Sequence, residues 1–368
     1  MSVSALEFTQ KLSAQPKSDQ ERAAILADPG FGNHFTDHTA VIDYRVSETG
    51  EGVWQNARIE PYGPIAMDPA ASVLHYGQEI FEGLKAYRHE DGSIWTFRPE
   101  ANSARLNASA RRLALPELPE ELFLESLRRL VAVDRDWVPS GDGESLYLRP
   151  FMIATEAFLG VRPAREVSYR VIASPAGNYF GGELKPVSIW LSTKYARAGR
   201  GGTGEAKCGG NYAASLIAQM EGEANGCQQV LFLDEFNDNA IEELGGMNVF
   251  FVFKDGRLVT PALTGTILRG VTRNSVLELG RDRGLKVEER KITLDEWRDG
   301  VASGEITEVF ACGTAAVITP VGELKSETET IGSPEAAAGE VTMSIRRELL
   351  GIQTGAVEDT RGWLTRLA

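Results

Sequence analysis

Apolar and polar residues alternate along much of the first half of the chain, which is the pattern of strands with one buried face. Two hairpins are predicted in this half, one turning at residues 49–52 and one at Asp91-Gly92, because Gly-containing pairs suit tight turns between strands. Strands are predicted at residues 41–44, 53–59, 84–88, 93–97, 145–155 and 167–174.

Helical spacing, with apolar residues three and four positions apart, occurs in two stretches of the same half. In residues 100–115, the apolar residues that lie toward one face are Ala104, Leu106, Ala110 and Leu113. Residues 120–133 do the same with Phe123, Leu127, Leu130 and Val131. Both stretches are therefore predicted to be amphipathic helices that turn these residues toward the core.

The second half of the chain also mixes strands and helices. Strands are predicted at residues 187–192, 230–233, 249–253 and 258–260. One helix is predicted over residues 211–225, with Leu216, Ile217 and Met220 on one face, and another from residue 271 to residue 284. Because both halves mix the two kinds of element, the fold class is predicted to be α/β or α+β.

A stretch dense in Gly and Pro, residues 174–182, separates the two halves. A chain of 368 residues is too long for one typical hydrophobic core and suits two domains. We therefore expect a small N-terminal α/β domain over residues 1–176, an interdomain linker over residues 177–187 and a large C-terminal domain over residues 188–368.

Composition and charge restrict the class of protein and its partners. Hydrophobic residues make up 42% of the chain and charged residues 24%, which is typical of a soluble globular protein. The net charge of -14 disfavours binding to nucleic acid or to an anionic membrane surface. The sequence lacks the features of a signal peptide and any apolar run long enough to span a membrane, so a cytoplasmic protein is expected.

Cysteine and histidine are scarce. The three cysteines, Cys208, Cys227 and Cys312, form no CxxC pair, and the four histidines follow no zinc-ligand spacing. We therefore expect a reducing compartment and no metal site.

Lys207 lies in the segment that is most informative about chemistry. A Gly-rich loop, residues 199–204, precedes it, and Gly209-Gly210 and Asn211-Tyr212 follow it at the start of a predicted helix. Glycine on both sides lets other groups approach a lysine closely. A neutral lysine amine attacks carbonyl groups and burial favours the neutral form, so Lys207 is a candidate for imine chemistry. Taken alone, the segment also fits an ordinary solvated lysine on a loop.

Three other segments supply groups that suit one ligand. Glu243 comes just before Gly245-Gly246 and a predicted strand. Residues 265–273 form a Gly-bracketed loop that runs into a helix, and residues 313–316 form a turn of small residues after a strand. Both can offer backbone N–H groups and a Thr hydroxyl to an anion. Each segment is ordinary by itself, but an amine, a carboxylate and two anion sites are together what pyridoxal 5′-phosphate (PLP) requires.

In this order, the segments resemble those of the fold-type IV PLP enzymes and, more narrowly, of the branched-chain amino-acid aminotransferases. The resemblance runs from about residue 36 to residue 363 and rests on residues 74–76, 81–87, 146–150, 207–212, 243–250 and 313–316. It implies two mixed α/β domains joined by a linker, with the cofactor between them. It also implies a transaminase that moves the amino group between leucine, isoleucine or valine and 2-oxoglutarate by a ping-pong mechanism.

Matching motif to motif implies a role for each cofactor-binding residue. Lys207 would bind the cofactor covalently and move a proton during catalysis, and Glu243 would keep the pyridine nitrogen protonated. Tyr212 would contact the phenolic oxygen of the cofactor. The residues implied to bind the phosphate are Arg105, Val271, Thr272 and Thr314.

The resemblance also implies which residues bind the substrate side chain. Phe81, Tyr147 and Tyr179 would line an apolar pocket. Arg149, with the hydroxyl of Tyr76, would receive the γ-carboxylate of glutamate at the edge of that pocket. Because aromatic residues also fill ordinary cores, these assignments depend on the resemblance and not on residue type.

Two further implications concern the substrate carboxylate and the partner subunit. The backbone N–H groups of Thr314 and Ala315 would face the substrate α-carboxylate. Leu159 and Val161 match a loop that reaches into the pocket of the neighbouring subunit, which implies a homodimer.

Two alternatives stay open. A D-amino-acid aminotransferase or an aminodeoxychorismate lyase would share the fold, although residues 81–87 and 147–150 favour the branched-chain enzyme. A non-catalytic protein could bind PLP in the same cavity, although the presence of Lys207 and Glu243 argues against it. The CxxC of mammalian members is absent after Cys312, so no thiol regulation is implied, and Cys208 has no functional assignment.

Overall fold

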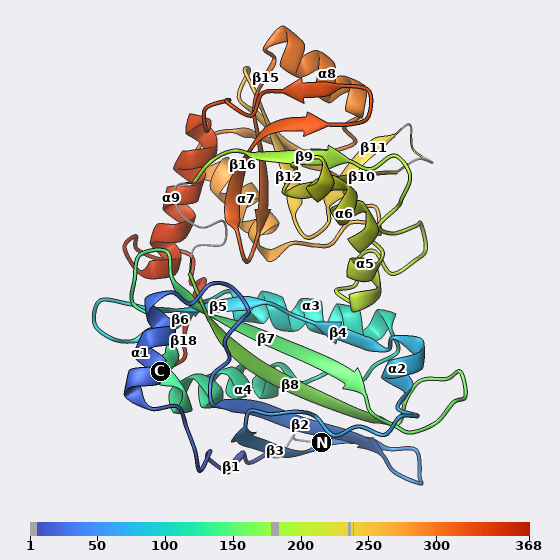
Figure 1. Ribbon diagram of the computed structural model, residues 1–368, viewed down its shortest axis with the longest axis vertical. Helices are drawn as coiled ribbons and strands as arrows, with labels where there is room; N and C mark the ends of the chain where they lie inside the picture. The colour runs from blue at the N-terminus through green and yellow to red at the C-terminus, as the bar shows by residue number, and fades with distance from the viewer. Residues whose placement is uncertain (1–5, 178–183, 235–236, 238) are drawn as a thin grey trace. The chain divides into compact units, whose positions relative to one another are not determined.

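The computed structural model describes residues 6–177, 184–234, 237 and 239–368, and the chain divides into two compact units (Figure 1). Unit 1 comprises residues 1–181, 206–209 and 351–368, and unit 2 comprises residues 182–205 and 210–350. Two segments that the sequence places in the C-terminal domain thus group with unit 1. Residues 178–183, most of the expected linker, lie outside the described residues.

Among its described residues, unit 1 contains a nine-stranded sheet ordered β1-β3-β2-β8-β7-β5-β6-β18, with β4 paired to β7. The strands are β1 (Thr9–Gln10), β2 (His38–Val46), β3 (Gly52–Pro61), β4 (Glu79–Phe81), β5 (Leu84–Arg88), β6 (Ile94–Phe97), β7 (Ser145–Ala154), β8 (Glu166–Ala176) and β18 (Leu364–Arg366). The six strands predicted for the first half are confirmed. Because β18 pairs with β6, residues 351–368 group with unit 1.

The helices of unit 1 are α1 (Asp19–Ala27), α2 (Ser72–Tyr76), α3 (Pro99–Arg112) and α4 (Glu120–Val133), followed by the 3-10 turn η1 (Arg135–Trp137). α4 contacts β2 and β8, and it buries all four apolar residues predicted for its inner face, Phe123, Leu127, Leu130 and Val131. These residues fill the core of unit 1 together with the inner faces of the sheet strands.

The inner face of α3 differs from the prediction. Leu106 and Ala110 are buried as expected, but Ala104 is exposed and Leu113 ends the helix half-buried. The other buried residues of the helix include Asn102, Ser103, Arg105 and Ser109. Polar side chains are rarely buried without partners, so this face of α3 must contact other polar groups.

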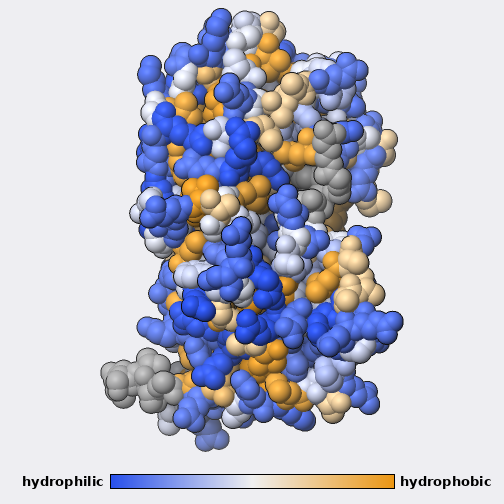
Figure 2. Space-filling model, turned by 90° about the vertical axis from the view of Figure 1, so that its left-hand side faces the viewer, coloured by the Kyte–Doolittle hydropathy of each residue, from blue (hydrophilic) through white to orange (hydrophobic). Residues whose placement is uncertain are grey.

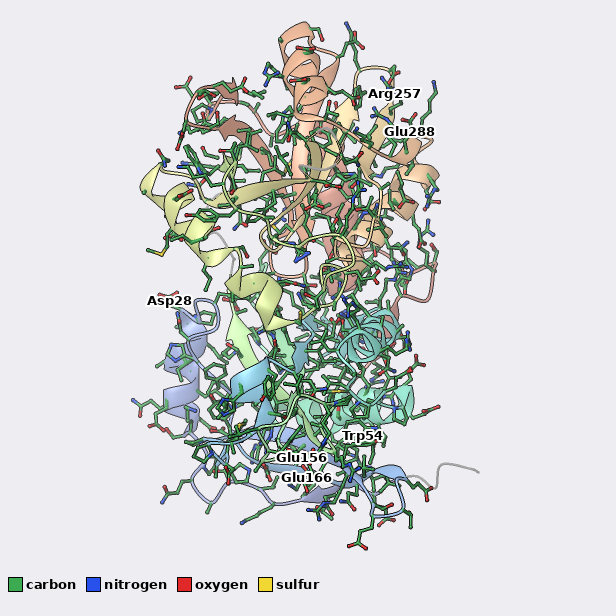
Figure 3. The ribbon with its side chains drawn as sticks, turned by 90° about the vertical axis from the view of Figure 1, so that its right-hand side faces the viewer. Asp28, Trp54, Glu156, Glu166, Arg257 and Glu288 are labelled. Carbon is green, nitrogen blue, oxygen red and sulfur yellow. The ribbon has the colours of Figure 1, made fainter. Side chains whose placement is uncertain are left out.

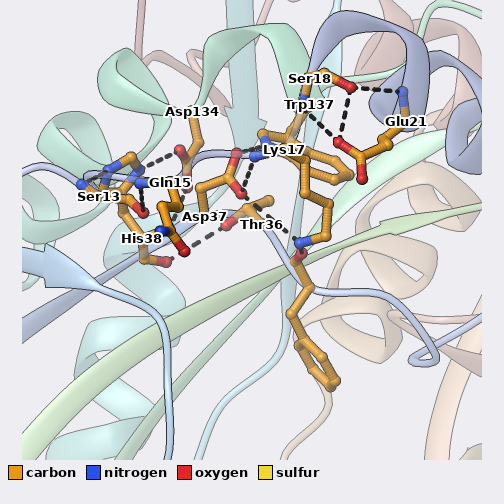
Figure 4. A network of polar contacts seen from close by, with 11 residues as sticks. Ser13, Gln15, Lys17, Ser18, Glu21, Thr36, Asp37, His38, Asp134 and Trp137 are labelled. Carbon is orange, nitrogen blue, oxygen red and sulfur yellow. Dashed lines mark hydrogen bonds and ion pairs between the residues drawn. The ribbon is translucent and has the colours of Figure 1, made fainter.

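A buried network binds the N-terminal segment of unit 1 to the sheet (Figure 4). Nδ1 of His38 lies 2.6 Å from Oδ1 of Asp134, and the backbone N–H of Ser13 donates to Nε2 of His38 over 2.9 Å. Because Nε2 accepts a bond, Nδ1 is the nitrogen that donates to Asp134. The indole N–H of Trp137 donates to Asp37 over 2.8 Å. His38 therefore has a structural partner on each ring nitrogen.

Unit 2 is built, over the part that the structure describes, on a second nine-stranded sheet ordered β11-β10-β9-β16-β15-β12-β13-β14, with β17 paired to β16. Its strands are β9 (Val187–Leu191), β10 (Gln229–Asp234), β11 (Ala240–Leu244), β12 (Asn248–Phe253), β13 (Arg257–Pro261), β14 (Lys286–Arg290), β15 (Ile306–Gly313), β16 (Val317–Lys325) and β17 (Thr330–Gly332). The four strands predicted for this half are confirmed. β12 and β15 pair antiparallel, and the buried rings of the partnered residues Phe250 and Phe310 stack with centroids 5.1 Å apart.

The remaining helices are α5 (Gly209–Ala213), α6 (Leu216–Ala224), α7 (Val271–Asp282), α8 (Leu294–Ser303) and α9 (Glu340–Thr354). The single helix predicted over residues 211–225 is interrupted between α5 and α6, which corrects that prediction. The small residues Ala218 and Gly222 are the ones that α6 buries, against Trp190 and Val230. The apolar residues of its other face, Leu216, Ile217 and Met220, are exposed.

The surface seen in Figure 2 carries hydrophilic side chains with apolar ones scattered among them. Within the described ranges, no helix combines the length and the apolar character needed to cross a membrane. The same residues bring together no group of three or more His, Cys, Asp or Glu side chains that could hold a metal ion.

Candidate active site

Lys207 extends from an irregular stretch of backbone that belongs to unit 1. Its Nζ lies 4.7 Å from the centroid of the Phe81 ring, at the end of β4. Loss of hydration, with the positive charge of Arg105, lowers the pKa of Lys207 from 10.5 to about 8, although Glu82 opposes the shift. Roughly a tenth of the amine is therefore neutral at pH 7, far more than for an ordinary lysine, and the neutral form is the one that attacks carbonyl groups and accepts protons.

A buried ion pair between Glu82 and Arg105 acts electrostatically on the Lys207 amine. Nε of Arg105 donates to Oε1 of Glu82 over 2.7 Å, and Nη2 donates to Oε2 over 2.8 Å. Nδ2 of Asn102 also donates to Oε2, over 2.7 Å. Burial alone would raise the pKa of Glu82, but Arg105, Lys207 and Asn102 hold it below its usual value. Glu82 thus stays ionised and fixes the orientation of the arginine that the sequence assigns to a phosphate.

Tyr147 and Arg149 lie two residues apart on β7, so both side chains project from the same face of the sheet. Nη2 of Arg149 donates to the Tyr147 hydroxyl over 2.9 Å, and the guanidinium carbon lies 4.8 Å from the centroid of the Phe81 ring. Nε of Arg149 is buried and has no hydrogen-bond partner among the described residues. A buried N–H without a partner is costly, and an incoming carboxylate would satisfy it.

Tyr76, Leu159 and Val161 form an exposed group of expected site residues. The hydroxyl of Tyr76, at the end of α2, donates to the backbone carbonyl of Leu159 over 2.5 Å. The side chain of Val161 is 87% exposed, and that of Leu159 is 65% exposed. Within the described part of the chain no hydrogen bond joins Tyr76 to Arg149.

An ion pair holds the loop that carries Leu159 and Val161. The carboxylate of Glu156, labelled in Figure 3, accepts bonds from Nη2 of Arg162 over 2.7 Å and from the backbone N–H of Arg165 over 2.5 Å. The loop is therefore fixed at both ends while its apolar tip stays exposed. Tyr179, expected in the side-chain pocket, lies outside the described residues.

In unit 2, the carboxylate of Glu243 is buried on β11. Its Oε1 accepts bonds from the Arg197 side chain and from the backbone N–H of Leu268, the latter over 2.8 Å. Arg197 is buried as well and also donates to two backbone carbonyls. Glu242, the neighbouring residue, points to the other face of the strand, and burial raises its pKa. An arginine partner favours the ionised form of Glu243, so this residue and not Glu242 has the anchored negative charge.

The start of α7 presents the backbone N–H groups of Val271 and Thr272, the residues expected to bind a phosphate. Asn248, on β12, donates its Nδ2 to the Leu268 carbonyl over 3.1 Å. A Cβ at Gly270 would lie 2.1 Å from Oδ1 of Asn248, so glycine is required where the chain enters the helix. Asn248 and Glu243 therefore position the loop before α7 together.

Tyr212, Thr314 and Ala315 are placed near the turn between β11 and β12. A Cβ at Gly246, in that turn, would lie 3.9 Å from the Tyr212 ring. A Cβ at Gly313 would lie 3.5 Å from the Gly246 carbonyl. Thr314 and Ala315 follow Gly313 directly, in the tight turn between β15 and β16. Unit 2 thus gathers these three residues from parts of the chain that are far apart in sequence.

Comparison with known proteins identifies the family. The family model for class IV aminotransferases matches residues 79–324, which include Lys207 and Glu243. The chain is 59% identical to the branched-chain-amino-acid aminotransferase of Mycolicibacterium smegmatis and 57% identical to that of Mycobacterium tuberculosis, with 100% of both chains covered in each case. This chain belongs to the branched-chain aminotransferases. It is accordingly a transaminase of class IV.

Solved structures of branched-chain aminotransferases share its fold. The enzyme of Escherichia coli matches with a TM-score of 0.73 at 28% identity, over 89% of this chain and 99% of that chain. The T.th. enzyme, solved with pyridoxamine 5′-phosphate, matches with a TM-score of 0.71 at 30% identity, over the same shares. The expected mixed α/β fold of the fold-type IV enzymes is therefore confirmed.

Several polar residues contact the expected site residues or the Lys207 segment but were given no role from the sequence, namely Glu79, Glu82, Ser109 and Arg197. Glu82 has a local signal, because it is a charged residue between Phe81 and Gly83-Leu84, directly after β4. Its partner Arg105 is 23 positions away, and Arg197 lies 46 positions from Glu243. No sequence pattern pairs residues at such distances.

Proposed function

We propose that this protein moves the amino group between leucine, isoleucine or valine and 2-oxoglutarate, with PLP as its cofactor, in a ping-pong cycle. The observation that carries the proposal is the amine of Lys207, which is dehydrated above the Phe81 ring and has a pKa of about 8. Relatives named branched-chain-amino-acid aminotransferase, which match along the full chain, support the same activity.

The residues present suit PLP. The chain offers an amine, a carboxylate that is paired with an arginine, and N–H donors at the start of a helix. When bound, PLP supplies an aldehyde that takes up amino groups and a ring that withdraws electrons from the substrate α-carbon. We propose that it is held by Lys207, Arg105, Tyr212, Glu243, Val271, Thr272 and Thr314. Solved relatives contain pyridoxamine 5′-phosphate or N-(5′-phosphopyridoxyl)-L-glutamate, which supports this cofactor.

Proton movement is assigned to Lys207. With a pKa of about 8, its Nζ can take a proton from the substrate α-carbon and return one during the same half-reaction. The Phe81 ring excludes water from one side of the amine. Glu243, kept ionised by Arg197, would hold a proton on the pyridine nitrogen.

The substrate pocket must accept an apolar side chain in one half-reaction and a carboxylate in the other. Phe81 and Tyr147 supply an apolar wall, and we propose that Tyr179 extends it. A carboxylate against that wall alone would be buried without a partner, which is costly. We propose that Arg149 binds this carboxylate. Its guanidinium lies against both rings, and its Nε has no hydrogen-bond partner within the described residues.

The remaining assignments concern the substrate α-carboxylate and the assembly. We propose that the N–H groups of Thr314 and Ala315 bind that carboxylate. We also propose that the Tyr76 hydroxyl joins Arg149 in binding the γ-carboxylate of glutamate. We further propose a homodimer in which the loop of Leu159 and Val161 enters the pocket of the partner subunit, because both side chains are apolar and exposed. The three cysteines are free, which suits a reducing cytoplasm.

Amino transfer from leucine, isoleucine, valine and D-alanine to 2-oxoglutarate tests the proposal. We expect turnover with the three branched-chain amino acids and none with D-alanine. Turnover with D-alanine would favour a D-amino-acid aminotransferase, and no turnover by PLP-loaded protein would favour a non-catalytic role. Borohydride reduction should attach the cofactor to the peptide that contains Lys207, and label on another lysine would overturn that assignment.

A further inference from the structure

The backbone on both sides of Lys207 is bound to unit 1 by side chains that have no assigned role. We propose that Glu79 and Ser109 are positioning residues that hold the Lys207 segment against β4 and α3 and so fix the place of its amine. This inference rests on the proposed function of Lys207 as the cofactor-binding lysine. It goes beyond that function because neither residue belongs to the cofactor or substrate set.

Hydrogen bonds to β4 and α3 hold the segment. The backbone N–H of Lys207 donates to Oγ of Ser109 over 2.9 Å, and the backbone N–H of Phe81 donates to the Lys207 carbonyl over 2.9 Å. Two residues later, the backbone N–H of Gly209 donates to Oε1 of Glu79. Both main-chain polar groups of Lys207 therefore have partners in unit 1. One of these partners, Ser109, is 98 positions away in the sequence.

Side-chain packing holds the same segment from the other side. Ala206 is 2% exposed and Cys208 is 3% exposed, and both belong to the hydrophobic core of unit 1. Lys207 lies between these two anchors, and its Nζ lies against the Phe81 ring. This packing also accounts for Cys208, whose place next to the lysine had no explanation from sequence.

The two proposed positioning residues lie on elements that also shape the surroundings of the amine. Glu79 and Phe81 are two residues apart on β4, and Ser109 and Arg105 are four residues apart on α3, so each pair lies on one face of its element. Each element thus binds the backbone of the lysine segment and also presents a group to the amine. A change in either bond would move Nζ relative to the Phe81 ring and the Arg105 charge.

Gly209 shows that the Glu79 contact is close. A Cβ at this position would lie 2.5 Å from Oε1 of Glu79, so a side chain here would displace that carboxylate from the Gly209 N–H. The glycine after Lys207-Cys208 therefore lets a carboxylate approach the backbone closely. Burial raises the pKa of Glu79, although the Gly209 bond and the charge of Arg149 act against that shift.

The test compares Ser109→Ala with Ser103→Ala in PLP-loaded protein. Ser103 is buried on the same helix but has no hydrogen bond to the described residues of the Lys207 segment. Losing one hydrogen bond should speed hydrogen exchange of the Lys207 amide about 2- to 10-fold in Ser109→Ala only. The pH midpoint of the visible absorbance of the bound cofactor should shift in Ser109→Ala and stay constant in Ser103→Ala. Equal behaviour of the two variants in both measurements would overturn the role of Ser109.

Glu79→Leu and Glu79→Gln form the second comparison. A glutamine oxygen can still accept the hydrogen bond from the Gly209 N–H. Glu79→Gln should therefore keep the parent's hydrogen-exchange rate and its pH midpoint of cofactor absorbance, whereas both values should change in Glu79→Leu. Loss in both variants would contradict a role through hydrogen bonding. This inference alone would be overturned if borohydride labelled Lys207 in the parent while Ser109→Ala and Glu79→Leu kept the parent's exchange rate and absorbance midpoint. Label on another lysine of the parent would overturn the proposed function as well.

Discussion

Lys207 carries a charge that the fold disfavours. Its pKa is about 8 in the folded chain against 10.5 ordinarily, so between these pH values the unfolded chain binds a proton that the folded chain does not. Stability from this group is therefore lost as pH falls from about 10.5 to 8 and regained as pH rises. Lys207→Met removes the titration. In urea unfolding of cofactor-free protein, the parent should gain stability relative to this variant between pH 8 and 10, and parallel curves would contradict the prediction.

Arg149 should matter for one of the two half-reactions. Its Nε has no hydrogen-bond partner in the described chain, and its guanidinium lies against Phe81 and Tyr147. Arg149→Met removes the charge that a γ-carboxylate needs, and the loss of a charged hydrogen bond corresponds to a roughly 10- to 100-fold loss of specificity for glutamate. Single-turnover rates with leucine and glutamate measure this, with Arg129→Met on the exposed surface of α4 as the control. Equal losses for both substrates would mean that Arg149 is structural.

At the scale of elements, α4 has a buried apolar face that the sequence predicts correctly. Leu130, on that face, is 0% exposed, whereas Leu12 is 54% exposed. Leu130→Ala should therefore lower the free energy of unfolding by about 2–5 kcal/mol, and Leu12→Ala by less than about 0.5 kcal/mol. Chemical denaturation of the two variants compares one substitution in two environments. Similar losses of unfolding free energy in the two variants would contradict the prediction, because they would mean that Leu12 is as buried as Leu130.

α3 shows what periodicity leaves out at the same scale. The spacing of Leu106 and Ala110 predicts the helix, and the structure contains it. Its buried face is nevertheless largely polar, because Arg105 bonds to Glu82 and Ser109 bonds to the Lys207 segment. A pattern of hydrophobicity detects an apolar stripe, and it cannot detect polar residues that are buried because distant residues bind them.

At the scale of the whole molecule, the exposed apolar tip of residues 159–161 is the feature that an assembly would cover. Val161→Glu places a charge on a side chain that is 87% exposed in one chain, so it should not destabilise a monomer. If this tip enters a partner subunit, the charge is desolvated there and the dimer should weaken. Sedimentation at several concentrations should then show more monomer than for the parent or for Leu12→Glu. An unchanged dimer would place the interface elsewhere.

The sequence by itself determined the local elements and the order of the site motifs. Period-two and helical spacing depend on neighbouring residues, so the ten predicted strands and the α4 face could be predicted. Lys207, Glu243 and the two anion-binding turns indicated the cofactor chemistry, and the six matched segments indicated the family.

Only the tertiary structure decided which groups act on one another. It placed the Lys207 segment in unit 1, although residues 182–205 and 210–350 on both sides of it form unit 2. It brought together three hydrogen-bonded pairs, Arg105 with Glu82, Arg197 with Glu243 and Gly209 with Glu79, whose members lie 23, 46 and 130 positions apart in the sequence. The protonation of Lys207 follows from these placements, because hydration and nearby charge set a pKa and both depend on residues that the fold brings together.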